Sequence, residues 1–234
     1  LPGKVSIQPD EIQCAVAPSS NDLDVAPTLK CLLQAGNVAT GLLDLRGHVR
    51  TAAPAAEDLA SNLDGELNFT IKDGRLLRFS ILAKLIEVLN STEILFGSLP
   101  DVENEGIRFT RLQGTATMQG TRIVIDKGVV DGYSLEMGFQ GHLNIQEKSV
   151  DLTVLVAPLK TVDRLVKKIP ILSGLTRGNL ITIPVRISGS WEDPRVTPLS
   201  PQAVSKELVD LMRRTLELPF HILHPFMGSD NEDE

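Results

Sequence analysis

The sequence predicts a mainly β protein with a few helices, of the α+β class, built around a curved antiparallel sheet. Three observations lead to this prediction: runs in which apolar and polar residues alternate, turn pairs between those runs, and glycines inside them. Alternation with a period of two is typical of strands with one apolar face. Turn pairs between consecutive strands favour an antiparallel meander, and glycines inside strands permit bulges and curvature.

The strands follow from the alternating runs in chain order. Patterning is poorer before residue 38, where we expect two strands, at 4–8 and 12–16, and a loop at 18–22. The clear alternating runs are 43–49, 66–72, 123–125, 135–145, 152–156 and 181–191. The turn pairs are Asp73-Gly74, Gly120-Thr121, Asp131-Gly132 and Glu147-Lys148. Their positions between the runs predict hairpins.

Helical segments interrupt the meander. The longest candidate, 201–218, places apolar residues on one face and charged residues off it, and Pro219 is expected to end it. A second helix is expected at 79–89 with Asn90 as its stop, and a third at 161–168, before Pro170. The weaker candidates are 28–35 and 52–61.

Composition and charge exclude some functions. The chain is 42% hydrophobic but only 4% aromatic, and four acidic residues in the run 229–234 supply more than half of its net charge of −7. With one Trp, one Tyr and no cluster of Lys and Arg, the sequence lacks the basic patches and stacking platforms that bind nucleic acid. No apolar run is long enough to predict a membrane-spanning helix.

Residues that could carry catalysis are sparse. His48 and His142 fall on the polar phase of strands, and His221 and His224 lie three apart in an apolar segment without a third ligand. No Gly-x-Ser-x-Gly elbow and no phosphate-binding loop is present. We therefore expect no enzyme activity, no metal and no cofactor.

The two cysteines, Cys14 and Cys31, lie 17 residues apart with no second ligand beside either. That spacing is not a zinc pattern, because a structural zinc ion needs four ligands at tight spacings. The residues alone leave open a disulfide or two buried thiols.

One continuous apolar face of a sheet needs a cover, which can be a second sheet, helices or an apolar ligand. The predicted helices are short and few, so part of this face could remain uncovered and accept acyl chains. A closed core without any ligand is the alternative that the pattern leaves open.

The order of these pieces resembles a known family over residues 41–198. The passages that carry the resemblance are LLDLRGHV with LDGELNFTIKDGRL, FSILAKLIEVLNSTEILFG with IRFTRLQGTATMQGTRIVID, LEMGFQGHLNIQEKSVDLTVLVAPL, and IPILSGLTRGNLITIPVRISGSWEDPRVTP. Together they resemble the C-terminal domain of the AsmA family of bacterial envelope proteins, relatives of the TamB and YhdP proteins.

The resemblance implies a taco-like, repeating β-groove with an apolar inner face, which holds or moves phospholipid between inner and outer membranes without catalysis. It implies a periplasmic location, with an inner-membrane anchor in the full-length protein. Its lipid-groove candidates are Leu67, Phe69, Ile71, Ile123, Ile125, Leu135, Met137, Phe139, Leu152, Val154, Val156, Ile181, Ile183, Val185 and Ile187. An oxidising envelope would favour pairing of Cys14 with Cys31.

The resemblance also divides the chain. Residues 1–38 are expected to be the end of a preceding groove segment or N-terminal strands, 39–200 the β-groove domain, 201–228 a C-terminal amphipathic helical segment and 229–234 a disordered acidic tail. The chain is then expected to be a terminal piece of a longer protein. The helical segment could close the groove or dock an envelope partner. The alternative function is a structural module for outer-membrane protein assembly, acting through an exposed sheet edge.

Overall fold

One open antiparallel sheet dominates the protein. The computed structural model describes residues 3–8, 10–33, 38–77, 81, 84–85, 87, 106–133, 135–158 and 182–223, with the backbone alone for 31–33, 158 and 216–223. The strands are β1 (Gly3–Gln8), β2 (Glu11–Val16), β3 (Ser19–Asp24), β4 (Ala39–Ala53), β5 (Asp64–Leu76), β6 (Ile107–Gln119), β7 (Arg122–Gly132), β8 (Leu135–Asn144), β9 (Ser149–Pro158), β10 (Ile183–Ser190) and β11 (Arg195–Pro198).

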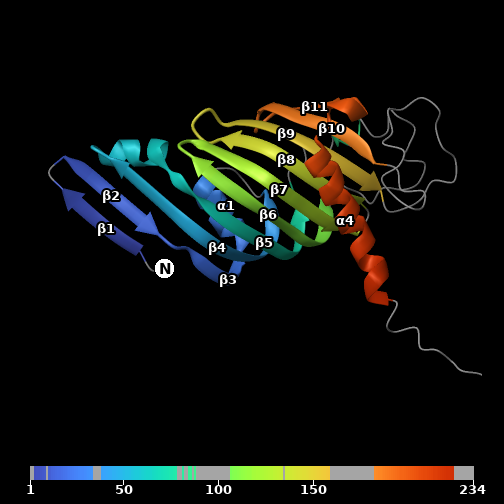
Figure 1. The fold of residues 1–234 in the computed structure, drawn as a ribbon, viewed down its shortest axis with the longest axis horizontal. Helices are drawn as coiled ribbons and strands as arrows, with labels where there is room; N and C mark the ends of the chain where they lie inside the picture. The colour runs from blue at the N-terminus through green and yellow to red at the C-terminus, as the bar shows by residue number, and fades with distance from the viewer. Residues whose placement is uncertain are drawn as a thin grey trace, which may run out of the picture.

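The strands follow one another in chain order across the sheet, and the predicted turns Gly120-Thr121 and Glu147-Lys148 join neighbouring strands. The hairpin predicted at Asp73-Gly74 is wrong, because β5 continues through these residues to Leu76. The order is β1-β2-β4-β5-β6-β7-β8-β9-β10-β11, with β3 paired to β4 beside this path, and every pairing is antiparallel. Figure 1 shows the twisted sheet running from β1 and β2 at one end to β10 and β11 at the other. The mainly β, antiparallel prediction is confirmed, and the sheet does not close on itself, since among the described residues no further strand pairs with β1 or β11.

The register aligns apolar residues of successive strands into rows on one face, which we call the core face. Seven cross-strand neighbours form its most buried row, called the buried row: Leu43, Ile71, Leu112, Val130, Met137, Val156 and Ile183. Because side chains alternate between the two faces of a strand, the neighbours of these residues in sequence face the other way, toward what we call the outer face.

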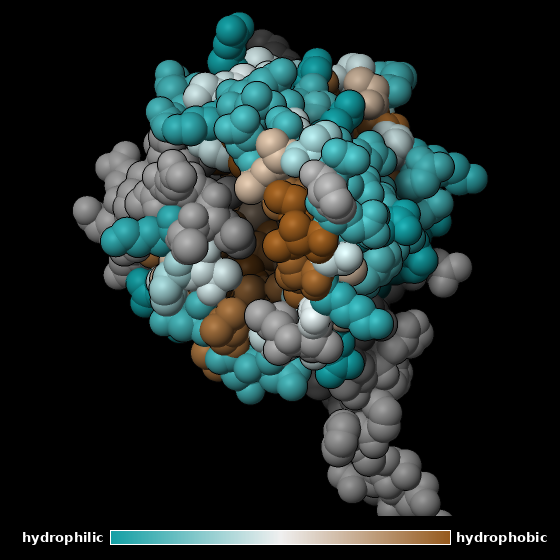
Figure 2. Space-filling view, turned by 90° about the vertical axis from the view of Figure 1, so that its left-hand side faces the viewer, coloured by the Kyte–Doolittle hydropathy of each residue, from teal (hydrophilic) through white to brown (hydrophobic). Residues whose placement is uncertain are grey.

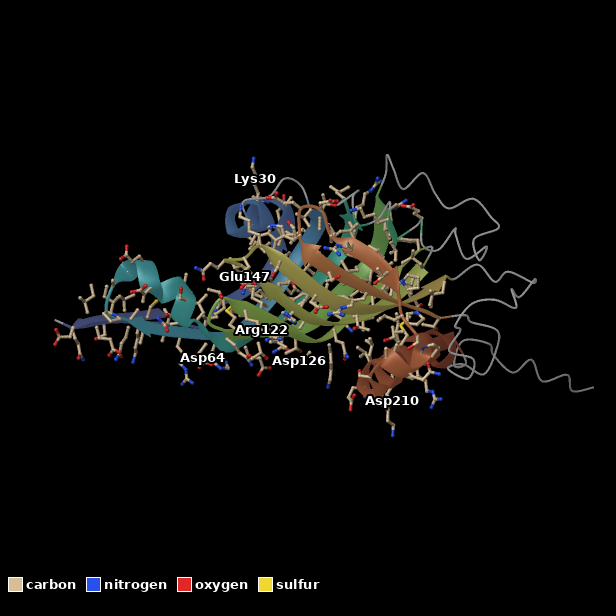
Figure 3. All side chains as sticks on the ribbon, turned by 90° about the horizontal axis from the view of Figure 1, so that it is seen from above. Lys30, Asp64, Arg122, Asp126, Glu147 and Asp210 are labelled. Atoms are coloured by element: carbon tan, nitrogen blue, oxygen red, sulfur yellow. The ribbon has the colours of Figure 1, made fainter. Side chains whose placement is uncertain are left out.

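Helices pack on both faces. Helix α1 (Val25–Leu33) supplies Val25 and Leu29 to the core cluster of the buried row, to which Leu85 also belongs. Helix α4 (Lys206–Leu223) packs Leu208 and Met212 against Leu155 and Ala157 of β9, whose side chains point to the outer face. Figure 3 shows α1, with Lys30, and α4, with Asp210, on opposite sides of the sheet.

The predicted helices differ from the observed ones in their bounds. The 28–35 candidate begins earlier, at Val25, where the Asp24 carboxylate accepts a hydrogen bond of 3.0 Å from the Ala26 N–H. The 52–61 candidate is partly wrong, because β4 continues to Ala53 and a 3₁₀ helix, η1 (Ala56–Asn62), follows. The described residues of the 79–89 candidate are helical, and the 161–168 candidate lies outside the described residues.

The C-terminal helix also departs from the prediction. A short 3₁₀ turn, η2 (Pro201–Ala203), comes first, and α4 then runs to Leu223 through Pro219, where a break was expected. Proline fixes φ near its helical value and removes one N–H donor, so a helix can continue past it with the loss of one hydrogen bond.

Three strands were not expected. The predicted loop at 18–22 is wrong because β3 pairs with β4 there, and the strand bulges near Asp22, which has φ = 53°. Lys72 of β5 holds this polar strand in place, with its Nζ 2.6 Å from Asp44 and 3.4 Å from Asp22. The strands β6 and β11 were missed as well, since a bulge between Phe109 and Arg111 shifts the alternation of β6 and β11 has only four residues.

Candidate functional site

The core face changes from filled to partly exposed along the length of the strands. In the buried row every side chain has an exposed fraction of 9% or less. At the opposite ends of the same strands a second set of cross-strand neighbours is only half-buried. We call it the rim row, and its apolar side chains are Val16, Val49, Met118, Ile123 and Leu143.

The rim row is aliphatic throughout. Val16 pairs with Val49, Met118 with Ile123, and Ile123 with Leu143, and Gly65 lies between the strands of Val49 and Met118. None of these side chains has a strong hydrogen-bond donor or acceptor. A partly exposed aliphatic row that continues a buried core is a surface at which any further apolar contact is favourable, because it removes apolar area from water.

The exposure of the core face is greatest at the β1–β2 end. Val5 and Ile7 of β1 share this face, since they pair with Cys14 and Ile12 of β2, and their exposed fractions are 67% and 77%. Figure 2, which looks from this side, shows apolar residues gathered in a hollow with hydrophilic residues above it and to its right. The apolar face of the sheet therefore reaches solvent at this end.

Between the two rows, paired glycines make room for aromatic rings. Gly114 pairs with Gly128, and each lies opposite a phenylalanine, Phe69 and Phe139 respectively. A Cβ atom at Gly128 would lie 2.3 Å from the Phe139 ring, and one at Gly114 would lie 2.7 Å from the Phe69 ring. The two rings therefore lie over glycine backbone instead of standing away from the sheet.

The register places the predicted lipid-groove residues on one face wherever they are described. Of the candidates, Ile71, Ile125, Leu135, Met137, Val154, Val156, Ile183, Val185 and Ile187 are buried, whereas Leu67, Phe69, Ile123, Phe139 and Leu152 are half-buried. Ile181 lies outside the described residues. Most of the candidates are therefore packed against other protein atoms, and only the second group has surface to offer.

Sequence reasoning missed four of the five rim residues. Val49 and Leu143 continue alternating runs that were recognised, so the register could have added them. Val16 belongs to a strand whose patterning is weak, and Met118 follows a bulge that shifts the alternation. Extending every alternating run to the turn that ends it would have found the first pair but not the second.

The outer face has a different chemistry. Over β7 to β10 it carries a polar hollow of about 520 Å³, whose lining includes Arg122, Asp126, His142, Asp151 and Arg186. The Arg186 guanidinium donates two hydrogen bonds to Asp151, at 2.8 and 2.6 Å, and this contact lowers the pKa of Asp151. His142 lies on this face, as its polar phase predicts.

A second outer hollow, of about 620 Å³, lies over β1, β2 and β4. Its lining includes Lys4, Gln13 and the ion pair of Arg50 with Asp64. The hollow over β7 to β10 is lined mainly by polar groups, whereas the hollow over β1, β2 and β4 also has apolar lining from Ala15 and Ala52.

A buried carboxyl group lies on the outer face beside the α4 region. Glu136 of β8 is 9% exposed, pairs with Asp131 and Ala157 on the neighbouring strands, and its Oε2 has no hydrogen-bond partner. Burial, with a smaller contribution from the Asp131 charge, raises the pKa of Glu136 to about 7. Burial also raises the pKa of Asp131, against the opposing effect of Arg111.

Metal ligands and thiols give no further site within the described ranges. No group of three or more His, Cys, Asp or Glu side chains there could hold a metal ion. Cys14 is half-buried on the core face of β2. The side chain of Cys31 lies outside the described residues, so its pairing with Cys14 stays a prediction.

Known proteins assign no role to these surfaces. Comparison with protein-family models, with curated proteins and with solved structures found no match. In the part of the chain that the structure describes, no helix combines the length and the apolar character needed to cross a bilayer. The geometry of the core face is therefore the basis for a functional proposal.

Proposed function

We propose that the protein is a non-enzymatic lipid-binding module that holds or transfers phospholipid acyl chains along its core face. In this proposal the sheet is a taco-like groove whose apolar inner wall is the core face. The rim row and the exposed residues of β1 and β2 form the binding surface. The buried row forms the floor that keeps the sheet folded.

The single observation that carries the proposal is the half-buried aliphatic rim row, which continues into the exposed apolar residues at the β1–β2 end. Acyl chains bind through area, at roughly 25 cal/mol for each Å² of apolar surface removed from water, and they need little directional chemistry. A row of Val, Met, Ile and Leu side chains across several strands matches this requirement. Phospholipid headgroups would stay at the hydrophilic residues that Figure 2 shows above the hollow and to its right.

The experiment that tests this proposal compares two neighbouring residues on β7. Ile123 lies in the rim row, and Val124 points to the outer face from the next position, with both half-buried. We expect the Ile123→Asp variant to bind a fluorescent acyl-chain probe at least about tenfold more weakly, because the buried carboxylate would meet the acyl chain. Val124→Asp should bind the probe as the wild type does.

Native mass spectrometry of the purified protein supplies an independent measurement. Co-purifying phospholipid, lost in Ile123→Asp and kept in Val124→Asp, supports binding on the core face. A wild-type protein that carries no lipid and does not bind the probe would refute the proposal. Thermal unfolding of each variant distinguishes lost binding from lost folding.

We also propose a cellular location that follows from this function. A module that moves phospholipid between two membranes belongs in the bacterial periplasm, anchored to the inner membrane in the full-length protein. Fractionation of cells that express the full-length protein tests this directly. Recovery in the cytoplasmic fraction would contradict it.

A second candidate function has one observation in its favour, the fully exposed edge strand β1. An exposed edge can add a strand from another protein, so the module could assist assembly of outer-membrane proteins through such contacts. This function predicts capture of barrel proteins by a lipid-free module. The Val5→Lys, Ile7→Lys double variant should abolish capture, whereas Ile123→Asp, away from the β1 edge, should leave it unchanged.

A further inference from the structure

The two edges of the sheet differ in how they are protected. At one edge β11 has four residues, begins with an exposed Arg195 and ends at Pro198, which has no N–H to donate. Short length, charge and proline are the devices by which natural edge strands avoid pairing. At the other edge β1 has six residues with no proline, and all six are exposed.

The open backbone groups of β1 can be assigned from its hairpin. Gln8 pairs with Glu11 across a two-residue connection, where the carbonyl of the first residue accepts from the N–H of the fourth. Hydrogen-bonded and non-hydrogen-bonded pairs alternate along an antiparallel ladder, so every second residue back from Gln8 bonds to β2. The N–H and C=O groups of Val5 and Ile7 therefore point to the open edge.

We propose that β1 pairs with β1 of a second copy of this chain, as an antiparallel pair with its two-fold axis at Ser6 and perpendicular to the sheet. This register places Val5 opposite Ile7 of the second copy, so the outward backbone groups of both residues bond in pairs. Such an axis keeps the same face of both sheets on one side. The two core faces thus become one continuous surface.

Side-chain chemistry agrees with self-pairing. The most exposed apolar side chains of the edge, Val5 and Ile7, become cross-strand neighbours and bury each other. Lys4, the one charged residue of β1, lies opposite Gln8 of the second copy, so no like charges face each other. A strand pair alone buries less than the roughly 1,200 Å² of a stable interface. We therefore expect a dimer that dissociates in the micromolar range.

Sedimentation velocity of the lipid-free protein over a concentration series tests the dimer, and its result does not depend on the proposed lipid function. The wild type should show reversible dimerisation. Val5→Lys with Ile7→Lys should raise the dissociation constant at least about tenfold, because each copy would bring two ammonium groups into the new strand pair and like charges would face each other. Tyr133→Lys, which replaces a side chain that is 57% exposed away from β1, should leave it unchanged.

A cross-link tests the register. Ser6 and its copy would form a non-hydrogen-bonded pair with Cα atoms about 4.5 Å apart, within disulfide reach. In a Cys14→Ser, Cys31→Ser background, Ser6→Cys should give a disulfide-linked dimer under mild oxidation by glutathione disulfide. Thr197→Cys on β11 should not. A protein that stays monomeric at every concentration, or a dimer indifferent to both β1 changes, would overturn the proposal.

Discussion

The β1 strand and the β9 strand carry the same kind of side chain on the same face of one sheet, yet they lie in opposite environments. Val5 and Ile7 of β1 are 67% and 77% exposed, whereas Val154 and Val156 of β9 are 4% and 0% exposed. Both pairs alternate with residues that point to the outer face. The difference lies in what covers each strand.

Strand β9 is covered on both faces. Its core-face residues belong to the cluster that includes Val25 of α1 and Leu85, and its outer-face residues Leu155 and Ala157 pack under α4. Strand β1 has a neighbour on one side, β2, and none of its described side chains is buried. Alternation therefore assigns a side chain to a face, while the elements that cover that face decide whether it is a core or a surface.

The largest expected effect comes from placing a charge on the core face of β9, compared with the same change on β1. Val156→Asp buries a carboxylate without a partner, so we expect a loss of more than about 4 kcal/mol in the free energy of unfolding, enough to leave little folded protein. Ile7→Asp should change it by less than about 0.5 kcal/mol, because the side chain is already in solvent. Urea unfolding followed by circular dichroism measures both values.

Similar losses in the two variants would mean that β1 is covered in solution. In that case Ile7→Asp should also change the sedimentation behaviour, since the proposed second copy is the cover that β1 has available. Unfolding at several protein concentrations then separates a loss of dimer from a loss of monomer stability.

The next largest effect is expected where α4 covers the outer face of the sheet. Met212 of α4 is fully buried, and its sulfur would lie 3.3 Å from a Cβ atom at Gly138 of β8. Met212→Ala should lower the free energy of unfolding by about 3 kcal/mol, because a cavity would replace the thioether side chain. Arg214→Ala, at an exposed position of the same helix, is the matched control, with an expected loss under about 0.5 kcal/mol.

Hydrogen exchange measures where the loss acts. We expect Met212→Ala to lower protection in α4 and on the facing part of β8, and to leave the amides of β4 and β5 unchanged. Equal loss of protection throughout the sheet would show that α4 and the sheet unfold as one unit.

A smaller effect is expected at Glu136, on the same covered side of the sheet. Because burial raises its pKa from 4.5 to about 7, the folded protein keeps a proton that the unfolded chain releases between these values. Stability should therefore fall as the pH rises from about 4.5 to 7 and level off above. After allowance for screening by solvent, the fall is about 2 kcal/mol.

Glu136→Gln checks the sign of this effect. The amide has no proton to lose, so the variant should gain about 2 kcal/mol over the wild type at pH 8 and differ little from it at pH 4. Glu66→Gln, on an exposed position of β5, is the control and should keep the wild-type pH profile. A wild-type free energy of unfolding that is flat between pH 4.5 and 8 would contradict the assignment.

The sequence predicts the face of each strand because that property is local. From the alternating runs alone, Met137, Val156 and Ile183 were assigned to one face, and the register aligns them as cross-strand neighbours. Turn pairs such as Gly120-Thr121 marked the hairpins for a similar reason, since positive φ at Gly120 (62°) is a local requirement of the turn.

The burial of each side chain and the pairing of the weakly patterned strands were not predictable in the same way, because they depend on contacts between distant parts of the chain. Val156 and Ile123 look alike in sequence, but one lies under the core cluster and the other lies in the rim row. The polar strand β3 was taken for a loop, since its pairing relies on Asp44 and Lys72 of other strands. The candidate site therefore had the right face but too few residues at its exposed end.

The smallest expected effect concerns the contact of Lys84 with the β10–β11 connection. The Lys84 ammonium pairs with Asp193 and donates a 2.8 Å hydrogen bond to the Pro194 carbonyl, beside Leu85, which is 2% exposed in the core cluster. The Asp193 side chain is 83% exposed, so solvent and salt screen the pair. Leu85, and not the ion pair, should therefore hold this part of the cover on the core face.

Accordingly, Lys84→Ala should shift the midpoint of thermal unfolding by no more than about 2 °C, and the shift should shrink further at high salt. Leu85→Ala should lower the midpoint by several times as many degrees as Lys84→Ala, because it opens a cavity in the core cluster. Differential scanning calorimetry at low and high salt measures both. A Lys84→Ala shift as large as that of Leu85→Ala would show that the polar contact, and not burial of Leu85, keeps the cover in place over β10, and the core face would then open at the β10 end when the salt concentration rises.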